Sequence, residues 1–199
     1  MDPIMNPFSP GAGCPPPALV GRNDVLEQAR VLLARSLRGR AAQSMLMTGL
    51  RGVGKTVLLN RIEQMAKKEG YQVIKLEIRE SRTLADSLAL PLRLLLYELD
   101  ALAGTHAAVR RALSALRNFI RSIRVNIGDI GIGVETIPGL ADSGDLGMAM
   151  PALFLAAAEA AAARGTGIAL LIDEIQLLEE EELHALIYAM HQLQQKLAP

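Results

Sequence analysis

The sequence predicts an α/β fold, a three-layer sandwich in which a parallel sheet lies between layers of helices. Three observations support this prediction. Short apolar runs at residues 44–48, 71–78 and 168–172 have the length and composition of strands. Longer segments with apolar residues at helical spacing lie between these runs. Half of the 199 residues are hydrophobic and only 3% are aromatic, so aliphatic side chains must form the core, which suits helices stacked on a sheet.

One domain is expected, and it should begin near Ala18. Residues 1–17 are rich in proline and glycine, which indicates a disordered leader. Residues 18–199 are long enough to bury a core as a single unit. A first helix opens within residues 18–40, with Asn23 or Asp24 as its N-cap.

The remaining elements follow from the hydrophobic period and from the glycines that interrupt it. A helix begins within residues 54–70 and ends at Gly70, and the order strand, helix, strand predicts a right-handed parallel unit. An insert at about 84–147 is longer than a simple crossover requires. The segments expected after residue 83 are helices at about 84–103, 105–122, 148–164 and 180–197, and a hairpin at 123–134 with a Gly128-Asp129 turn.

Charge balance and cysteine content exclude several classes of protein. Lys+Arg and Asp+Glu both number 21, so no global field draws the chain to nucleic acid or to an anionic membrane. The single cysteine, Cys14, cannot form an internal disulfide, which fits a reducing compartment. No apolar stretch approaches the ~20 residues of a membrane span, and the N-terminus lacks the features of a secretory signal. We therefore expect a cytoplasmic protein with no membrane partner.

A glycine-rich motif carries the strongest functional signal. It reads Gly49-Leu50-Arg51-Gly52-Val53-Gly54-Lys55-Thr56 and matches G-x-x-x-x-G-K-[ST] in full, between a predicted strand and a predicted helix. The glycines let backbone N–H groups turn inward as an anion nest, which the first turn of the next helix extends to Val57. Lys55 would meet the β and γ phosphates, and the Thr56 hydroxyl would complete a magnesium shell. This context favours a nucleotide-binding P-loop over a flexible turn.

A second motif, Asp173-Glu174, ends the apolar run 168–172. Ligands of such folds gather outside the carboxyl ends of the strands, so we expect Asp173 beside the P-loop on the magnesium side. Glu174 is then the candidate that orients or polarises the attacking water. Taken alone, the pair simply ends a strand and starts a loop. The adjacent glutamate and the lack of an Asn-Lys-x-Asp motif favour ATP over GTP.

With these motifs the chain resembles the AAA+ superfamily, and within it the bacterial and archaeal ATPases that resemble origin-recognition initiators and border on the STAND ATPases. The segments "LVGRNDVLE", "MLMTGLRGVGKT" and "ALLIDEIQLL" carry the resemblance, which spans about Ala18 to Leu197. It implies that Val20 and Gly21 touch adenine and that Arg22 opens the first helix.

The resemblance also implies parts that no segment up to Pro199 supplies. These are a strand with a polar sensor residue after Asp173-Glu174, a final strand, a helical lid and an arginine finger. We therefore expect a sandwich truncated after this second (Walker B) motif. Nucleotide binding should persist in weakened form, without efficient turnover by this piece alone.

The expected function is that of a Mg-ATP-binding ATPase domain. It would couple nucleotide binding and hydrolysis to a conformational or macromolecular-interaction switch. A DNA-associated remodelling or initiator-like ATPase is the alternative, and a P-loop kinase is less favoured. The expected cofactors are ATP and Mg²⁺, and the expected partners are ATP or ADP and a DNA or protein molecule. The sequence leaves a homo-oligomer open.

Two other groups of side chains are weaker functional candidates. One is an arginine stripe along the helix-to-hairpin stretch, made of Arg110, Arg111, Arg117, Arg121 and Arg124. A solvated face explains this stripe more simply than phosphate binding does. The other group is His184 and His191 on the last helix, which lack further ligands, so structural roles are favoured over zinc.

Overall fold

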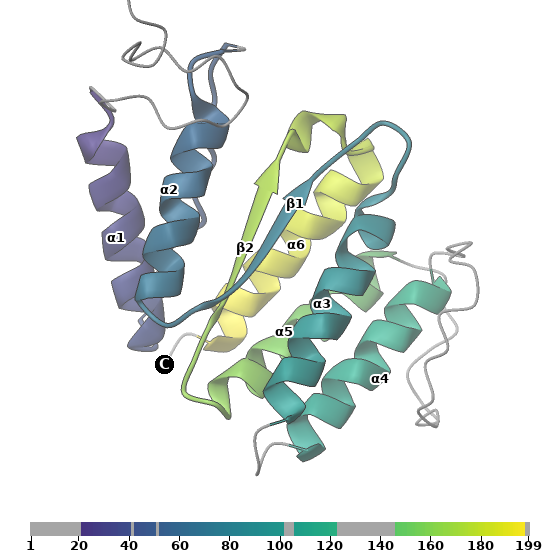
Figure 1. The fold of residues 1–199 in the computed structure, drawn as a ribbon. Coiled ribbons are helices and arrows are strands. Elements are labelled where there is room, and N and C mark those ends of the chain that lie inside the picture. Colours follow the sequence, from purple (N-terminus) through teal and green to yellow (C-terminus); the bar gives the residue numbers. More distant parts are fainter. Residues whose placement is uncertain (1–20, 41, 51, 102–105, 123–145, 198–199) are drawn as a thin grey trace, which may run out of the picture.

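The structure is a computed structural model that describes residues 21–40, 42–50, 52–101, 106–122 and 146–197. Its elements follow one another as shown in Figure 1. They are α1 (Asn23–Leu37), α2 (Lys55–Lys68), β1 (Gln72–Glu77), α3 (Leu84–Asp100), α4 (His106–Ser122), α5 (Leu146–Ala162), β2 (Ile168–Asp173), the short 3-10 helix η2 (Ile175–Leu177) and α6 (Glu180–Leu197).

A small parallel sheet lies at the centre of the described residues. β1 and β2 pair in register from Gln72 opposite Ile168 to Glu77 opposite Asp173. Figure 1 shows α1 and α2 on one face of this sheet and α3 to α6 on the other. The parallel pairing and the helices on both faces agree with the predicted α/β class.

Alternation along the strands sends side chains to two different cores. Ile74 and Leu76 of β1 join the large aliphatic core formed with α3 to α6. On the opposite face, Leu171 of β2 contacts a small cluster on α1 and α2 that includes Ala29 and Leu58. The layer formed by α1 and α2, which includes the glycine-rich motif, is therefore held to the sheet by small apolar clusters, apart from the main core.

The strand expected at residues 44–48 is not formed, and this prediction is wrong. Residues 42–50 have no regular secondary structure, although Met45 and Met47 still turn inward to the cluster on α1 and α2. A strand exists only when a neighbour pairs with it, and among the described residues no strand pairs with this segment. At the start of this segment, the Gln194 Nε2 atom of α6 donates to the Ala42 carbonyl over 3.2 Å.

The sheet differs from expectation in two further ways. The expected pairing of residues 44–48 with residues 71–78 is replaced by pairing between β1 and β2. The apolar run 168–172 predicts a strand buried on both faces, yet every residue of β2 is only half-buried. Since the described part of the chain supplies β2 with a strand on one side only, its side chains lack cover from a second neighbour.

The helices agree more closely with the sequence pattern. Gly70 ends α2 as predicted, with a left-handed φ of +86° and a hydrogen bond from its N–H to the Lys67 carbonyl. The N-cap of α1 is Arg22, so the prediction of Asn23 or Asp24 is wrong; both lie inside the first turn, and no side chain caps it. The predicted leader 1–17 and hairpin 123–134 lie outside the described residues.

Candidate functional site

The glycine-rich motif forms a tight loop between residue 48 and α2. Gly52 and Gly54 have φ values of +83° and +86°, a left-handed conformation in which other residues are strained. A Cβ atom on Gly49 would lie 3.1 Å from Val53 Cγ2, so the loop closes on its own first residue. Gly52 and Gly54 therefore suit their backbone conformation, whereas a Cβ atom at position 49 would force the Val53 side chain to shift slightly. Arg51 lies outside the described residues.

The loop leads directly into the N-terminus of α2. Gly54 is the N-cap, and α2 begins at Lys55 with no acidic side chain in its first turn. The first N–H groups of a helix lack intrahelical partners, and the helix dipole places partial positive charge there. The amides from Gly54 to Val57 therefore favour an anion, which is the physical basis of phosphate binding at such a terminus.

Lys55 lies back across the loop. Its Nζ atom donates to the Gly49 carbonyl over 2.8 Å and to the Leu50 carbonyl over 2.9 Å. Leu50 itself is 81% exposed, so this end of the loop is open to solvent. The ammonium group thus lies at the loop, where a phosphate could replace the two carbonyls as its partner.

Thr56 and Asp173 meet although 117 positions separate them. Thr56 Oγ1 in the first turn of α2 donates to Asp173 Oδ2 at the end of β2 over 2.7 Å. The Glu174 backbone N–H donates to the other carboxylate oxygen, Asp173 Oδ1, over 3.0 Å. The two sequence motifs therefore form one site, and the strand order places it at the carboxyl edge of the sheet (Figure 1).

This pair of oxygen groups suits a hard cation. Hydroxyl and carboxylate oxygens are ligands that Mg²⁺ accepts, usually with water and phosphate oxygens completing the shell. Among the described residues, no cluster of three or more His, Cys, Asp or Glu side chains could hold a metal unaided. Thr56 and Asp173 would therefore hold Mg²⁺ together with a bound phosphate.

Glu174 has a strained backbone. Its φ of +56° is the single positive value among non-glycine residues in the described part of the chain. This left-handed turn ends β2 and starts η2, and it costs on the order of 1 kcal/mol. The Glu174 side chain is exposed, and its Oε2 atom accepts a hydrogen bond from Gln176 Nε2. The carboxylate is thus held by Gln176 of its own local segment, while the Glu174 backbone N–H contacts Asp173.

Two side chains at the site were not predicted from the sequence. Arg22 Nη2 donates to the Val53 carbonyl over 3.0 Å, whereas the sequence assigned Arg22 only to the start of the first helix. Gln176, the partner of Glu174, had no assigned role. Of the expected adenine contacts, Gly21 is exposed and lies next to Arg22, and Val20 lies outside the described residues.

The arginine stripe does not form as predicted. Arg110 and Arg111 of α4 are exposed, but Arg117 is only 8% exposed and lies in the helical core. The apolar face of α4 is wide enough to include that position. The Arg121 side chain and Arg124 lie outside the described residues.

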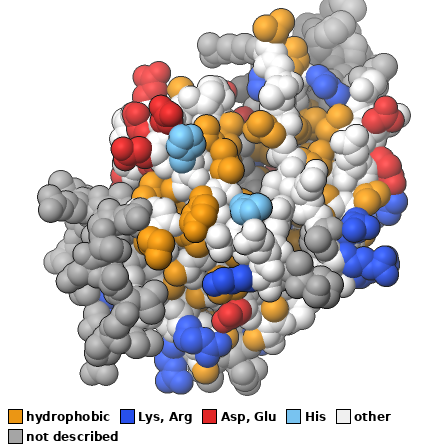
Figure 2. Space-filling model, turned by 180° about the vertical axis from the view of Figure 1, so that it is seen from behind, with side chains coloured by type: hydrophobic (Ala, Val, Ile, Leu, Met, Phe, Trp, Pro, Cys, Tyr) orange, Lys and Arg blue, Asp and Glu red, His pale blue; other side chains and the backbone are white. Residues whose placement is uncertain are grey.

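The two histidines of α6 are surface side chains. His184 and His191 are both exposed, with Ile187 and Tyr188 exposed between them. Figure 2 shows a face of the molecule on which histidine side chains (pale blue) lie near hydrophobic side chains (orange). His191 Nε2 forms a hydrogen bond with Gln195 Nε2 over 2.9 Å.

Within the described ranges, no helix is long and apolar enough to cross a membrane.

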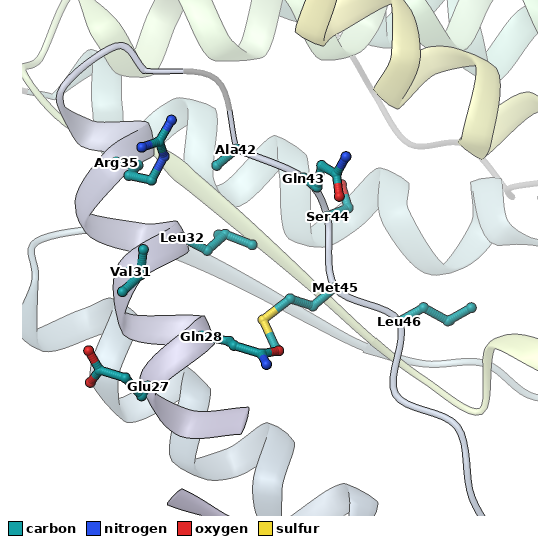
Figure 3. A pocket seen from close by; sticks show the side chains of 10 residues that line it. All are labelled: Glu27, Gln28, Val31, Leu32, Arg35, Ala42, Gln43, Ser44, Met45 and Leu46. Carbon is teal, nitrogen blue, oxygen red and sulfur yellow. The ribbon is translucent and has the colours of Figure 1, made fainter. Parts of the chain in front are cut away.

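A hollow between α1 and residues 42–46 is separate from this site. It has a volume of about 600 Å³. Figure 3 shows Met45 pointing toward α1 and Leu46 pointing away from it. Its lining comes entirely from α1 and from the unpaired segment, and includes neither the glycine-rich loop nor the Asp173-Glu174 pair.

Comparison with known proteins gives one result. A family model described as an AAA ATPase domain matches residues 18–199. No curated protein and no solved structure was found to match the chain.

Proposed function

The chain belongs to the family of AAA ATPase domains, and from this premise we propose that residues 49–57, Asp173 and Glu174 bind and hydrolyse Mg-ATP. The hydrogen bond from Thr56 Oγ1 to Asp173 Oδ2, 2.7 Å long, carries this proposal. It joins the hydroxyl and the carboxylate that the chemistry needs at one magnesium ion, beside amides suited to phosphate. The Lys55 ammonium lies at the same loop.

In the proposed mechanism, the chain acts by positioning and by charge. The amides from Gly52 to Val57 hold the phosphates, while Lys55 leaves its two carbonyls and pairs with the β and γ phosphate oxygens. Bound Mg²⁺ would neutralise charge that develops on those oxygens. Thr56 and Asp173 would orient that ion through their oxygens. The Glu174 carboxylate would align a water molecule for attack on the γ phosphate.

We further propose that nucleotide binding drives a conformational or macromolecular-interaction switch in a cytoplasmic protein. The contacts of Lys55 support this, because its ammonium must exchange the Gly49 and Leu50 carbonyls for phosphate oxygens when the nucleotide arrives. A DNA-associated remodelling or initiator-like ATPase is the second candidate. The exposed Arg110 on α4 favours it, since its side chain could meet a phosphate backbone, as could Arg111 if it left its ion pair with Glu159.

Titration of a fluorescent ATP analogue with magnesium tests the binding site. The Lys55→Ala variant should lower the affinity by about tenfold or more, because a charged hydrogen-bond partner of the phosphates is lost. Lys68→Ala, at the exposed far end of the same helix, is the matched control and should bind like the wild type. Unchanged affinity in Lys55→Ala would overturn the site assignment.

Phosphate release tests the catalytic role and separates the two candidates. Glu174→Gln should bind ATP normally but lower turnover by about 100-fold, because an amide cannot accept the proton of the water. Turnover that rises on adding DNA supports a remodelling ATPase. Tight retention of ATP with slow hydrolysis, unaffected by DNA, supports a switch. Full turnover in Glu174→Gln would contradict its role.

A further inference from the structure

A side-chain hydrogen bond links the start of α1 to the middle of the glycine-rich loop. Arg22 Nη2 donates to the Val53 carbonyl over 3.0 Å, across 31 positions of sequence. Arg22 is half-buried, and its own carbonyl accepts the Leu26 N–H over 3.1 Å as α1 begins. The backbone of Arg22, which carries the donor, is therefore fixed at the start of a helix.

The acceptor lies at the centre of the anion nest. Val53 stands between Gly52 and Gly54, whose φ values are +83° and +86°. When successive N–H groups turn toward an anion, a carbonyl between them can accept a hydrogen bond only from outside the nest, from water or from another side chain. Arg22 gives the Val53 carbonyl that partner on the side of α1. A guanidinium is always charged, so it also adds positive charge near the loop.

The helix that carries Arg22 is itself anchored to the helix that follows the loop. Ala29 of α1 is buried against Leu58 and Ile62 of α2, and Val25 and Leu26 lie against the same cluster. The loop is therefore held to α2 by its covalent link and by Lys55, and to α1 by Arg22. Loss of the arginine would remove this hydrogen bond between the loop and α1.

We propose that Arg22 is a positioning residue that orders the P-loop amides for a triphosphate before the nucleotide binds. This proposal rests on the proposed function for its ligand, the polyphosphate of ATP. Arg22 acts through the Val53 carbonyl and needs no contact with the nucleotide. Its effect should therefore fall on the phosphates and leave recognition of the nucleoside unchanged.

Hydrogen exchange in nucleotide-free protein tests the ordering directly. In Arg22→Ala, amides in a peptide covering residues 49–57 should exchange about threefold to tenfold faster, as expected for one lost hydrogen bond to a charged donor. Arg22→Lys keeps the charge and one donor and should restore part of the protection. Arg38→Ala, an exposed arginine at the other end of α1, is the control with the same charge change and should match the wild type.

Binding measurements on the same variants test the consequence for the ligand. Arg22→Ala should weaken ATP binding by about tenfold relative to Arg38→Ala, while adenosine binding stays unchanged. Equal exchange in Arg22→Ala and Arg38→Ala would overturn the proposal. Faster exchange without loss of ATP affinity would also overturn it, as would an equal loss for adenosine.

Failure of the proposed function would look different from failure of this inference. If the wild type does not bind Mg-ATP at all, the proposed function is wrong, whereas the exchange measurement still decides whether Arg22 orders the loop. If the wild type binds ATP and the loop exchanges alike in all variants, only the role of Arg22 is wrong. Circular dichroism and thermal unfolding of each variant confirm that the comparison is made between folded proteins.

Discussion

The backbone of Glu174 is the clearest sign of function at the scale of single residues. A left-handed conformation is unfavourable for a glutamate, and asparagine or glycine would adopt it at lower cost. The turn nevertheless directs the main-chain N–H of Glu174 to Asp173 and its carboxylate to Gln176. The Glu174 backbone costs stability, yet its contacts fix the positions of both acidic side chains. Such a strained residue is expected where the chemistry of the site, and not folding, requires that residue type.

Tyr71 should make the stability of the protein fall as the pH rises in the alkaline range. Tyr71 is only 8% exposed, and its hydroxyl donates to the Leu33 carbonyl over 2.8 Å. Burial raises the pKa of this phenol above its ordinary value of 10.0. The folded protein thus favours the protonated form, and the stabilisation is complete below pH 10 and is lost as the pH rises through the raised pKa.

The free energy of unfolding should therefore fall above about pH 10, and urea unfolding at a series of pH values measures it. Tyr71→Phe should remove this part of the pH dependence and lower stability at neutral pH by about 1 kcal/mol, since the Leu33 carbonyl loses its donor. Tyr188→Phe, at an exposed tyrosine of α6, is the control and should keep the alkaline loss. The same alkaline profile in Tyr71→Phe and wild type would contradict the prediction.

The residues of the site were predictable to different degrees. Thr56 and Asp173 belong to motifs whose spacing reflects one ligand, so the sequence could place them together. Arg22 reaches Val53 only because α1 packs on α2, and no local pattern specifies where the end of a long side chain will lie. Sequence patterns report which face of an element is apolar, but they say little about polar contacts across elements.

At the scale of elements, helices were predicted better than strands. A helix forms its hydrogen bonds within itself, so the predicted range 180–197 coincides with α6. A strand needs a neighbour, and residues 44–48 have the composition of a strand without a partner among the described residues. Met45 and Met47 of this apolar run turn inward while Leu46 between them is exposed, and the run cannot show whether the main chain is paired.

One carboxylate connects the starts of two helices. Glu182 Oε1 accepts the Leu84 N–H at the start of α3 over 2.7 Å, and its Oε2 accepts the Glu179 N–H before α6 over 3.3 Å. Helix N-termini have unpaired donors, and a negative charge there is favourable. Glu182 therefore ties together two helices that lie far apart in the sequence.

Replacing Glu182 by Ala should lower the free energy of unfolding by about 1–2 kcal/mol, because two N–H groups lose their acceptor. Glu181→Ala is the matched control: it removes an exposed carboxylate from the same turn of α6 and should have a much smaller effect. Urea unfolding followed by circular dichroism compares the two. Equal losses in both variants would indicate a general charge effect and contradict the capping role.

For the whole molecule, the two faces of the sheet differ in how firmly they are covered. The α3–α6 face shares one large core with β1 and β2. The α1–α2 face rests on two small clusters, supplemented by the Thr56–Asp173 hydrogen bond. The layer that carries the glycine-rich loop should therefore open locally at a lower free energy than the layer behind it.

Hydrogen exchange of the intact chain should reveal this difference as exchange in α2 at least about tenfold faster than in α5. Mg-ATP at a hundredfold excess over its Kd should add about 2.7 kcal/mol of stability and protect α2 more than α5. Magnesium without nucleotide is the control. Exchange in α5 as fast as in α2 would show that the two layers open together.

The resting position of Lys55 has a consequence for which ions the loop retains. The ammonium group already has two carbonyl partners, at 2.8 Å and 2.9 Å. An anion that replaces them must bind the ammonium more strongly than these two hydrogen bonds do. A singly charged ion such as chloride offers one weak contact in return. A polyphosphate offers several charged oxygens at once. The loop should therefore retain a polyphosphate in preference to a singly charged ion such as chloride.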